Sequence, residues 1–279
     1  MIFPAINLEL NIPRIAFNLF GVNVYWYGII IVSAMVIALL LCKKDDGKYG
    51  IRFATILDLA IYIIPISIIC ARIYYVVFNF SLYENNLVKI LDFRTGGLAI
   101  YGGIIGAVLT IYVYCKAKKI CFVDILDYLA PFLALGQSIG RWGNFVNIEA
   151  YGTETKLPWR MGIWENGIYK EVHPTFLYES ISTFLIFILL YLIRKNRKYR
   201  GQITYLYLTL YGAVRMLVEG LRIDSLMYQN MRVSQVLSML LFVVFGGILI
   251  YKEVSNRKIT KNAEYKGWKD IEKPENLLT

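Results

Sequence analysis

The stretch VYWYGIIIVSAMVIALLL, residues 24–41, contains no charged side chain and is followed at once by the basic segment CKKDDGKYGIR, residues 42–52. An apolar run of about 18 residues is long enough for an α-helix to cross the roughly 30 Å hydrocarbon core of a bilayer. Lys and Arg that directly follow such a run are typical of the end of a transmembrane helix. We therefore predict that residues 24–41 form the first membrane span.

The same alternation of apolar runs and charged loops continues along the chain. Of the 279 residues, 57% are hydrophobic and 18% are charged, and the mean hydropathy is +0.51. Soluble domains carry about half apolar and about a quarter charged residues. The pattern predicts an all-α integral membrane protein with about seven transmembrane helices. The other six spans are expected at residues 56–78, 96–114, 122–139, 174–193, 202–218 and 233–251.

The basic residues predict the orientation of these spans. The loops after the first, third and fifth spans, together with residues 252–279, hold nineteen of the thirty Lys and Arg residues. Cytoplasmic loops of membrane proteins are enriched in Lys and Arg. We therefore expect the N-terminus to lie outside and the C-terminus in the cytoplasm. The net charge of +10 is then explained by topology, and nucleic acid is not expected as a partner.

Three segments differ from the membrane spans. Residues 1–17, with Pro4 and Pro13, are expected to lie along the membrane interface. Residues 140–173 are too long for a simple connection and are rich in turn-forming residues. They predict a small extracytoplasmic subdomain between spans four and five, inserted in a polytopic membrane domain of residues 1–251. Residues 252–279 are expected to form a polar, basic cytoplasmic tail.

Charged groups near the end of the sixth span form a first candidate site. Tyr211, Arg215, Glu219 and Arg222 follow one another at intervals of four, four and three residues, so they share one face of a helix. Ionisable residues inside membrane spans are costly and usually functional. A structural ion pair between Arg215 and Glu219 is the alternative interpretation, but it leaves Arg222 unexplained.

A second candidate site follows the fourth span, in GRWGNFVNIEAYG, residues 140–152. It combines Arg141 with Asn144, Asn147 and Glu149 among glycines. A guanidinium with neighbouring amides suits a phosphate or its esters. A helix end followed by a turn would account for the glycines but not for these four polar residues together.

Two further motifs leave their role open. In GGLAIYGGIIGA, residues 96–107, Gly102 and Gly106 match the small-xxx-small pattern of close helix packing, beside Tyr101. HPTFLYE, residues 173–179, contains the chain's one histidine, which we interpret as a residue at the start of a helix rather than as a catalytic group. Because His, Cys and carboxylates form no cluster with metal-ligand spacing, no metal and no cofactor are expected.

These motifs resemble those of bacterial prolipoprotein diacylglyceryl transferases. The resemblance covers residues 24–28, 96–107, 140–152, 173–179 and 211–222 in the order of the family. It implies an enzyme of the bacterial cytoplasmic (inner) membrane with its active site toward the extracytoplasmic side. Such enzymes transfer the diacylglyceryl group of phosphatidylglycerol to the lipobox cysteine thiol of preprolipoproteins, forming a thioether and releasing glycerol phosphate. The implied partners are phosphatidylglycerol, preprolipoprotein signal peptides and membrane lipids.

The resemblance also implies roles for single residues. Arg141 and Arg215 would stabilise the phosphate leaving group, since guanidinium groups can neutralise charge where no metal does. The pattern of this family has a histidine at the position of Tyr101. A mechanism with a histidine base at this position is therefore in doubt for this protein. We expect Tyr101 to donate a hydrogen bond or position a group rather than to act as the base. The other expected substrate-binding residues are Tyr27, Asn144, Glu149, Gly152, Glu219 and Arg222.

A transporter or receptor for an anionic ligand is the alternative function. Seven spans with internal charges would also fit that class. However, a transporter of inverted repeats usually has paired broken helices in two halves, and no such internal symmetry is present. A receptor would leave the outward Arg, Asn and Glu residues unexplained.

Overall fold

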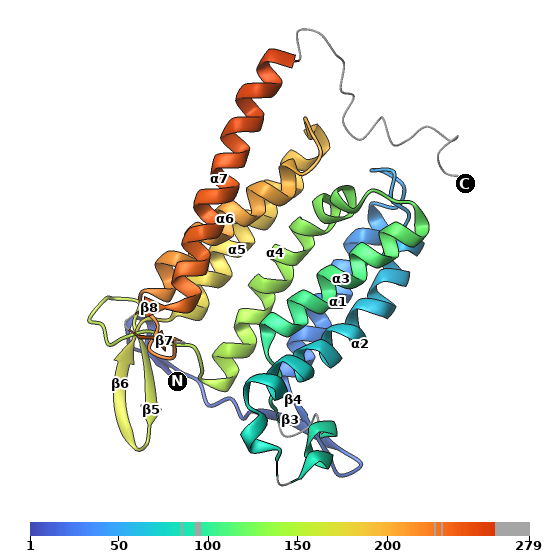
Figure 1. Cartoon of the computed structure of the whole chain (residues 1–279). Coiled ribbons are helices and arrows are strands. Elements are labelled where there is room, and N and C mark those ends of the chain that lie inside the picture. Colours follow the sequence, from blue (N-terminus) through green and yellow to red (C-terminus); the bar gives the residue numbers. More distant parts are fainter. Residues whose placement is uncertain (85, 93–95, 226, 230, 260–279) are drawn as a thin grey trace. The chain divides into compact units, whose positions relative to one another are not determined.

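The computed structural model describes residues 1–84, 86–92, 96–225, 227–229 and 231–259. Within these residues the fold is mostly helical, which confirms the predicted class (Figure 1). Each predicted span coincides with one of the α-helices. They are α1 Trp26–Lys44, α2 Phe53–Phe78, α3 Ile100–Lys118, α4 Phe122–Asn147, α5 Thr175–Ile193, α6 Gln202–Glu219 and α7 Val233–Ile259.

Six of the described helices are long and apolar enough to cross a membrane, so this is a multi-pass membrane protein. The exception is α6, which covers the predicted sixth span. Its apolar residues are interrupted by tyrosines and threonines and by Arg215 and Glu219 near its end. The helix is therefore less apolar than its neighbours because one face carries polar groups. The predicted tail begins inside α7, and its residues 260–279 lie outside the described part of the chain.

Short strands and 3-10 helices fill the connections, and the sequence did not indicate the strands. The strands are β1 Ile2–Phe3, β2 Leu8–Glu9, β3 Ile15–Leu19, β4 Val22–Tyr25, β5 Met161–Glu165, β6 Ile168–Val172, β7 Met227–Tyr228 and β8 Met231–Arg232. The 3-10 helices are Pro4–Ile6, Phe80–Leu82, Leu87–Leu91 and Arg194–Asn196.

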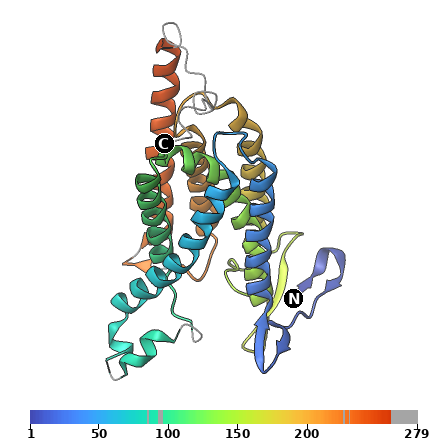
Figure 2. The same ribbon diagram turned by 90° about the vertical axis from the view of Figure 1, so that its right-hand side faces the viewer.

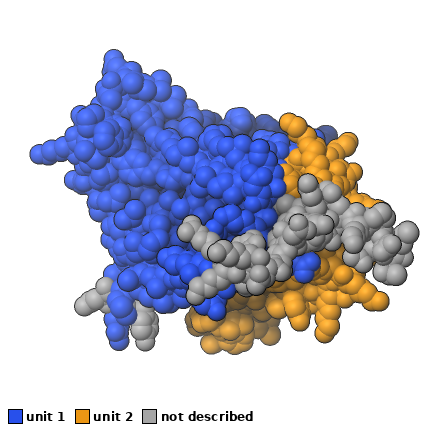
Figure 3. Space-filling view, turned by 90° about the horizontal axis from the view of Figure 1, so that it is seen from above, with its two compact units in different colours: residues 1–41, 127–279 blue, residues 42–126 orange. Residues whose placement is uncertain are grey.

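The chain divides into two compact units, which Figure 3 distinguishes by colour. Unit 1 comprises Met1–Leu41 and Asp127–Thr279, and unit 2 comprises Cys42–Leu126. The boundary falls inside α4, so the first turn of that helix belongs to unit 2.

In unit 2, α2 and α3 pack at very close range. A Cβ atom on Gly102 would lie 2.4 Å from the carbonyl oxygen of Cys70, and one on Gly106 would lie 2.8 Å from the Cys70 Cβ. Real Cβ atoms do not approach other atoms so closely. Both glycines are therefore needed for helix packing, which is the small-xxx-small interpretation of this motif.

In unit 1, α4, α5 and α6 share an apolar core. Six buried residues form it: Ala130, Ala134, Ile186, Leu190, Ile203 and Tyr207. Helix α7 packs against α6 through Gly212, where a Cβ atom would lie 2.8 Å from the Ser238 carbonyl oxygen. The charged end of α6 is thus held against α5 on one side and α7 on another.

A four-stranded antiparallel sheet, in the order β2-β1-β5-β6, lies at one end of unit 1. Figure 2 shows the N-terminal strands beside the β5–β6 hairpin, and Ile2 pairs with Gly162. The hairpin turns at Asn166-Gly167, both with positive φ, as tight hairpin turns require. The N-terminal segment therefore joins the predicted subdomain 140–173, whose first residues continue α4 as far as Asn147.

Candidate active site

The candidate site is centred on a carboxylate that the sequence analysis did not single out. Glu179 lies in the second turn of α5, and its side chain is 3% exposed. One oxygen, Oε2, forms an ion pair with Nη2 of Arg141 from α4. The other, Oε1, lies 2.6 Å from Nη1 of Arg215 on α6 and 3.9 Å from Nη1 of Arg222. A single buried carboxylate therefore gathers three guanidinium groups from three segments of the chain.

A second carboxylate, that of Glu219, holds Arg215 in place. Oε2 of Glu219 lies 2.6 Å from Nη2 of Arg215, one helical turn away. Arg215 is thus held by Glu179 and Glu219 at once, so its planar guanidinium group has little rotational freedom. The predicted i, i+4 pair is present, but it is part of a larger network rather than an isolated structural bridge.

The acidic and the basic side chains of this cluster differ in how far they are exposed. The carboxylates of Glu179 and Glu219 are 3% and 2% exposed, whereas the side chains of Arg141, Arg215 and Arg222 are 19%, 14% and 12% exposed. The two carboxylates therefore lie deeper in the protein than the three guanidinium groups, which lie nearer to the solvent-accessible side of the cluster. An anion that approaches from that side meets N–H donors first, and charge-assisted hydrogen bonds to phosphate are among the strong ones.

The loop after α4 extends the cluster. Arg141 donates from Nη1 to Oδ1 of Asn144 at 3.2 Å, and Asn144 donates from Nδ2 to Oε1 of Glu149 at 2.7 Å. Tyr27 of α1 packs on the same helix end, because a Cβ atom on Gly143 would lie 2.7 Å from its ring. Four residues predicted from two distant motifs thus lie together.

Gly152 brings this loop against the segment that follows α6. Its amide donates to the His173 carbonyl at 3.0 Å, and the next amide, of Thr153, donates to the Leu221 carbonyl at 2.8 Å. A Cβ atom on Gly152 would lie 2.7 Å from the His173 Cβ. Only glycine fits here, and the close approach places Arg222 beside the loop.

Arg222 is anchored outside the helices. It donates from Nε and Nη2 to the two carboxylate oxygens of Asp224, at 2.9 and 2.8 Å. Burial alone would lower the pKa of Arg222, but Asp224 and the carboxylates of Glu179 and Glu219 raise it above its ordinary value. Burial likewise opposes ionisation of Asp224, yet Arg222 holds the pKa of that carboxyl below its ordinary value of 3.8. Both groups are therefore charged at neutral pH.

His173 lies directly before α5. Its Nδ1 is 3.2 Å from the Tyr178 hydroxyl, which also accepts a hydrogen bond from Nε1 of Trp159 at 2.7 Å. Its backbone carbonyl accepts from Gly152. These contacts tie the start of the helix to the loop, in line with the structural role that we expect for His173.

Tyr101 belongs to unit 2 and lies in the first turn of α3. The segment before it is held by Arg72, which lies in α2 and is 3% exposed. Arg72 donates to the carbonyls of Lys89 and Gly96, each at 2.7 Å, and to those of Ile90 and Gly97 at 2.9 and 3.0 Å. Arg72 thus fixes the backbone that leads to Tyr101, a role that the sequence pattern does not reveal.

Of the nine predicted site residues, eight therefore lie in one cluster of unit 1, and Tyr101 is described with unit 2. Glu179 is not among the predicted site residues, although it ends the motif of residues 173–179. The available signal was a carboxylate in the second turn of an apolar helix, since such a group needs a partner or a function. Groups of His, Cys, Asp and Glu that could hold a metal ion are absent from the described residues.

Comparison with known proteins identifies the family to which the chain belongs. The family model described as prolipoprotein diacylglyceryl transferase matches residues 14–251. The chain belongs to the prolipoprotein diacylglyceryl transferase family. The matched region contains every one of the nine predicted site residues, and Glu179 as well.

Several relatives of the transferase family are close in sequence over nearly their whole length. The protein of Clostridioides difficile (strain 630) is 49% identical over 88% of this chain and 96% of its own. That of Finegoldia magna is 49% identical over 85% of this chain and 94% of its own. The protein of Listeria monocytogenes serotype 4a is 46% identical over 86% of this chain and 90% of its own. All three are named phosphatidylglycerol–prolipoprotein diacylglyceryl transferase.

Proposed function

We propose that this protein transfers the diacylglyceryl group of phosphatidylglycerol to the lipobox cysteine thiol of a preprolipoprotein. A carbon–sulfur bond forms and the carbon–oxygen bond to the phosphate breaks. The products are a thioether-linked diacylglyceryl peptide and glycerol phosphate. Family membership and the names of the relatives support this reaction. The site lies at the extracytoplasmic side of the cytoplasmic membrane in this proposal, which rests on the distribution of Lys and Arg.

The observation that carries the proposal is the sharing of Glu179 by Arg141, Arg215 and Arg222. As the carbon–oxygen bond breaks, the lipid phosphate gains negative charge and becomes a monoester dianion. Fixed guanidinium groups stabilise such charge where it develops, without having to reorganise during the reaction. Arg141 and Arg215 bind the phosphate oxygens, and Glu179 and Glu219 set their orientation.

Neighbouring residues hold the rest of the lipid headgroup. Asn144, positioned by Glu149, offers an amide to the glycerol hydroxyls or to a phosphate oxygen. Tyr27 lies against the same helix end and lines the approach from α1. Arg222 adds a third positive charge at the edge of the site. Gly152 keeps the loop close enough for these groups to act on one headgroup.

The nucleophile belongs to the peptide substrate. A thiol has an ordinary pKa of about 8.5 and attacks as the thiolate, so a field of positive charge favours the reactive form. The arginine cluster provides such a field. Tyr101 acts as a hydrogen-bond donor that positions a reacting group, because a phenol with a pKa near 10 is a weak base at neutral pH.

Mass spectrometry tests the reaction. The purified protein is incubated with phosphatidylglycerol and a peptide that contains a lipobox cysteine. The peptide should gain the mass of one diacylglyceryl group, and a peptide with Ser in place of that Cys should gain none. An unchanged cysteine peptide, with active enzyme from one of the named relatives as positive control, would refute the proposal.

A further inference from the structure

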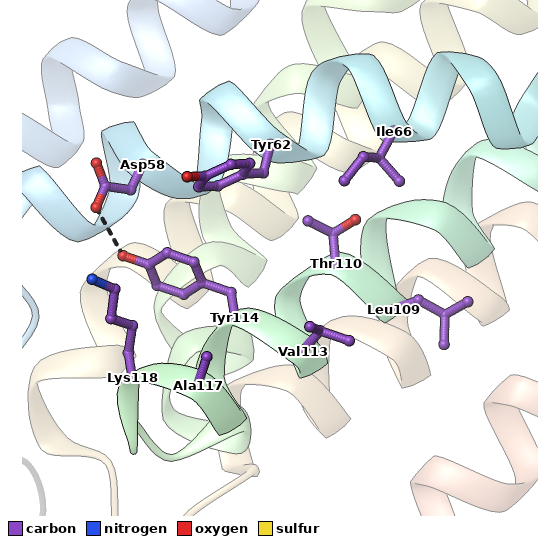
Figure 4. Close-up of a pocket in the computed structure, with 9 residues that line it drawn as sticks. All are labelled: Asp58, Tyr62, Ile66, Leu109, Thr110, Val113, Tyr114, Ala117 and Lys118. Atoms are coloured by element: carbon purple, nitrogen blue, oxygen red, sulfur yellow. Dashed lines mark hydrogen bonds between the residues drawn. The ribbon is translucent and has the colours of Figure 1, made fainter.

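Unit 2 carries a groove that the transfer reaction does not use. It lies between α2 and α3 and has a volume of about 540 Å³. Figure 4 shows its two ends. Asp58, Tyr114 and Lys118 lie together at one end, and Ile66 and Leu109 line the other.

The dimensions of the groove match one leaflet of a bilayer. Lys118 is at the end of α3 and Leu109 lies nine residues earlier, which corresponds to roughly 13 Å of helix. Half of the hydrocarbon core measures about 15 Å. The polar end coincides with the basic end of the helix, where Lys116 also lies, and Leu109 at the apolar end is the middle residue of this 19-residue helix. With α3 spanning the bilayer from end to end, the groove runs from the headgroup region to the depth of the acyl chains.

The polar end presents two separated charges of opposite sign. Asp58 is exposed although it lies in the second turn of a membrane helix. Its Oδ2 accepts a hydrogen bond from the Tyr114 hydroxyl at 3.1 Å, and Oδ1 has no partner among the described residues. Lys118 extends to the same end of the groove (Figure 4). Within the described part of the chain, Lys118 and Asp58 form no ion pair.

Two aromatic rings lie next to the carboxylate on the groove side (Figure 4). The ring centroids of Tyr62 and Tyr114 lie 6.3 Å apart, and both side chains line the groove next to Asp58. A carboxylate beside phenol rings is suited to an ammonium group, which gains from the opposite charge and from the ring faces.

We propose that this groove binds a phospholipid whose headgroup carries both an ammonium group and a phosphate. The ammonium group lies at Asp58, the phosphate at Lys118, and one acyl chain along Ile66, Leu109 and Val113. An anionic phospholipid such as phosphatidylglycerol has no cation for Asp58 and its charge is repelled there. The groove thus selects a lipid different from the proposed acyl donor.

Native mass spectrometry of the whole detergent-purified protein tests this site. The probes are phosphatidylethanolamine, phosphatidylglycerol and N-acetylated phosphatidylethanolamine, which keeps the phosphate and chains but lacks the ammonium group. We expect the wild type to retain phosphatidylethanolamine about tenfold more than either of the other two lipids. Equal retention of all three lipids would overturn the proposal.

Matched variants locate the bound lipid. Asp58→Asn and Lys118→Gln should each reduce retention of phosphatidylethanolamine about tenfold, and Val113→Trp should do so by filling the groove. Lys116→Gln is the matched control for Lys118→Gln, because it changes a lysine of α3 outside the lining, and it should bind as the wild type does. Tyr112→Phe, also on α3 and outside the lining, should likewise have no effect. If Asp58→Asn and Val113→Trp, shown to be folded by an unchanged unfolding temperature, retain the lipid fully, the site does not exist.

Discussion

Arg215 on α6 and Arg141 on α4 bind the two oxygens of the same carboxylate, that of Glu179 on α5. The contact between Arg215 and Glu179 measures 2.6 Å. Neither arginine can rotate without losing a buried ion pair, and breaking such a pair is strongly unfavourable. The distance between the two guanidinium groups is thus set by one side chain that does not itself face the accessible side of the site.

Glu179→Gln tests this arrangement directly. The amide keeps the size of the side chain but removes the charge that holds three arginines, so their donors turn away from the phosphate. We expect the turnover of diacylglyceryl transfer to fall by about 100-fold or more. Glu171→Gln, which removes a carboxylate paired with Arg160 on the hairpin, is the matched control and should leave turnover within about twofold. Near-normal turnover of a folded Glu179→Gln protein would contradict the assigned role.

Arg141→Ala should abolish most transfer while leaving the protein folded and inserted. Removal of one donor to a developing anion costs about 100-fold or more in rate. Arg141→Lys should recover little, because an ammonium group cannot contact Glu179 and a phosphate in the planar geometry of a guanidinium. Turnover of both variants is measured by peptide mass spectrometry. Normal turnover of Arg141→Ala would mean that Arg141 is structural.

Tyr101→Phe tests whether Tyr101 acts as the base or only positions a reacting group. A neutral hydrogen bond contributes roughly 0.5–1.5 kcal/mol, so its loss should slow transfer about tenfold and leave the pH profile unchanged. Tyr101→His offers the complementary comparison, because the imidazole has an ordinary pKa of about 6.5. If the position can host a base, that variant works with a pH optimum shifted downward. A Tyr101→Phe protein that binds phosphatidylglycerol and transfers nothing would contradict the positioning role.

The pair of Arg222 and Asp224 gives a prediction about pH. Because the pKa of Asp224 is lowered in the folded protein, its contribution to stability is complete above the ordinary value of 3.8. That contribution is lost as the pH falls through the lowered pKa. The difference in unfolding temperature between wild type and Asp224→Asn should therefore be constant from about pH 7 to about pH 5 and vanish only below about pH 4. A difference that already disappears near pH 6 would contradict this account.

Labelling of introduced cysteines tests the orientation. Lys198 is 59% exposed in the loop between α5 and α6, and Lys156 is exposed in the subdomain. In a background with the four native cysteines replaced by serine, Lys198→Cys should resist a membrane-impermeant thiol reagent added to intact cells. Lys156→Cys, the matched control, should react. Efficient labelling of Lys198→Cys from outside would overturn the orientation.

The helices could be predicted from sequence because apolar runs of span length have few alternative structures in a membrane protein. The strands could not. β1 and β2 are two residues each, and Ile2 pairs both with Glu9 and with Gly162, which is far away in the chain. Such short segments carry no periodicity of their own. Their structure is decided by tertiary contact.

Some residues of the candidate site could likewise be predicted from the sequence, and others could not. Arg141 and Arg215 could be predicted because charges at the ends of apolar helices are conspicuous and their motifs resemble a known family. The role of Glu179 could not, because it depends on how α4, α5 and α6 pack. A similar case is Asp127, fully buried on α4, which accepts from Arg197 at 2.9 Å and from the Gly201 amide at 2.7 Å. No spacing rule connects residues seventy positions apart.

In the proposed reaction, the arginine cluster drives departure of glycerol phosphate as the thioether forms. Both products can be measured in one reaction of the purified wild-type protein with phosphatidylglycerol and the lipobox peptide. We expect one glycerol phosphate for each diacylglyceryl peptide, and in Glu179→Gln both products should fall equally, by about 100-fold or more. Glycerol phosphate released without peptide, or thioether formed at the wild-type rate by Glu179→Gln, would contradict it.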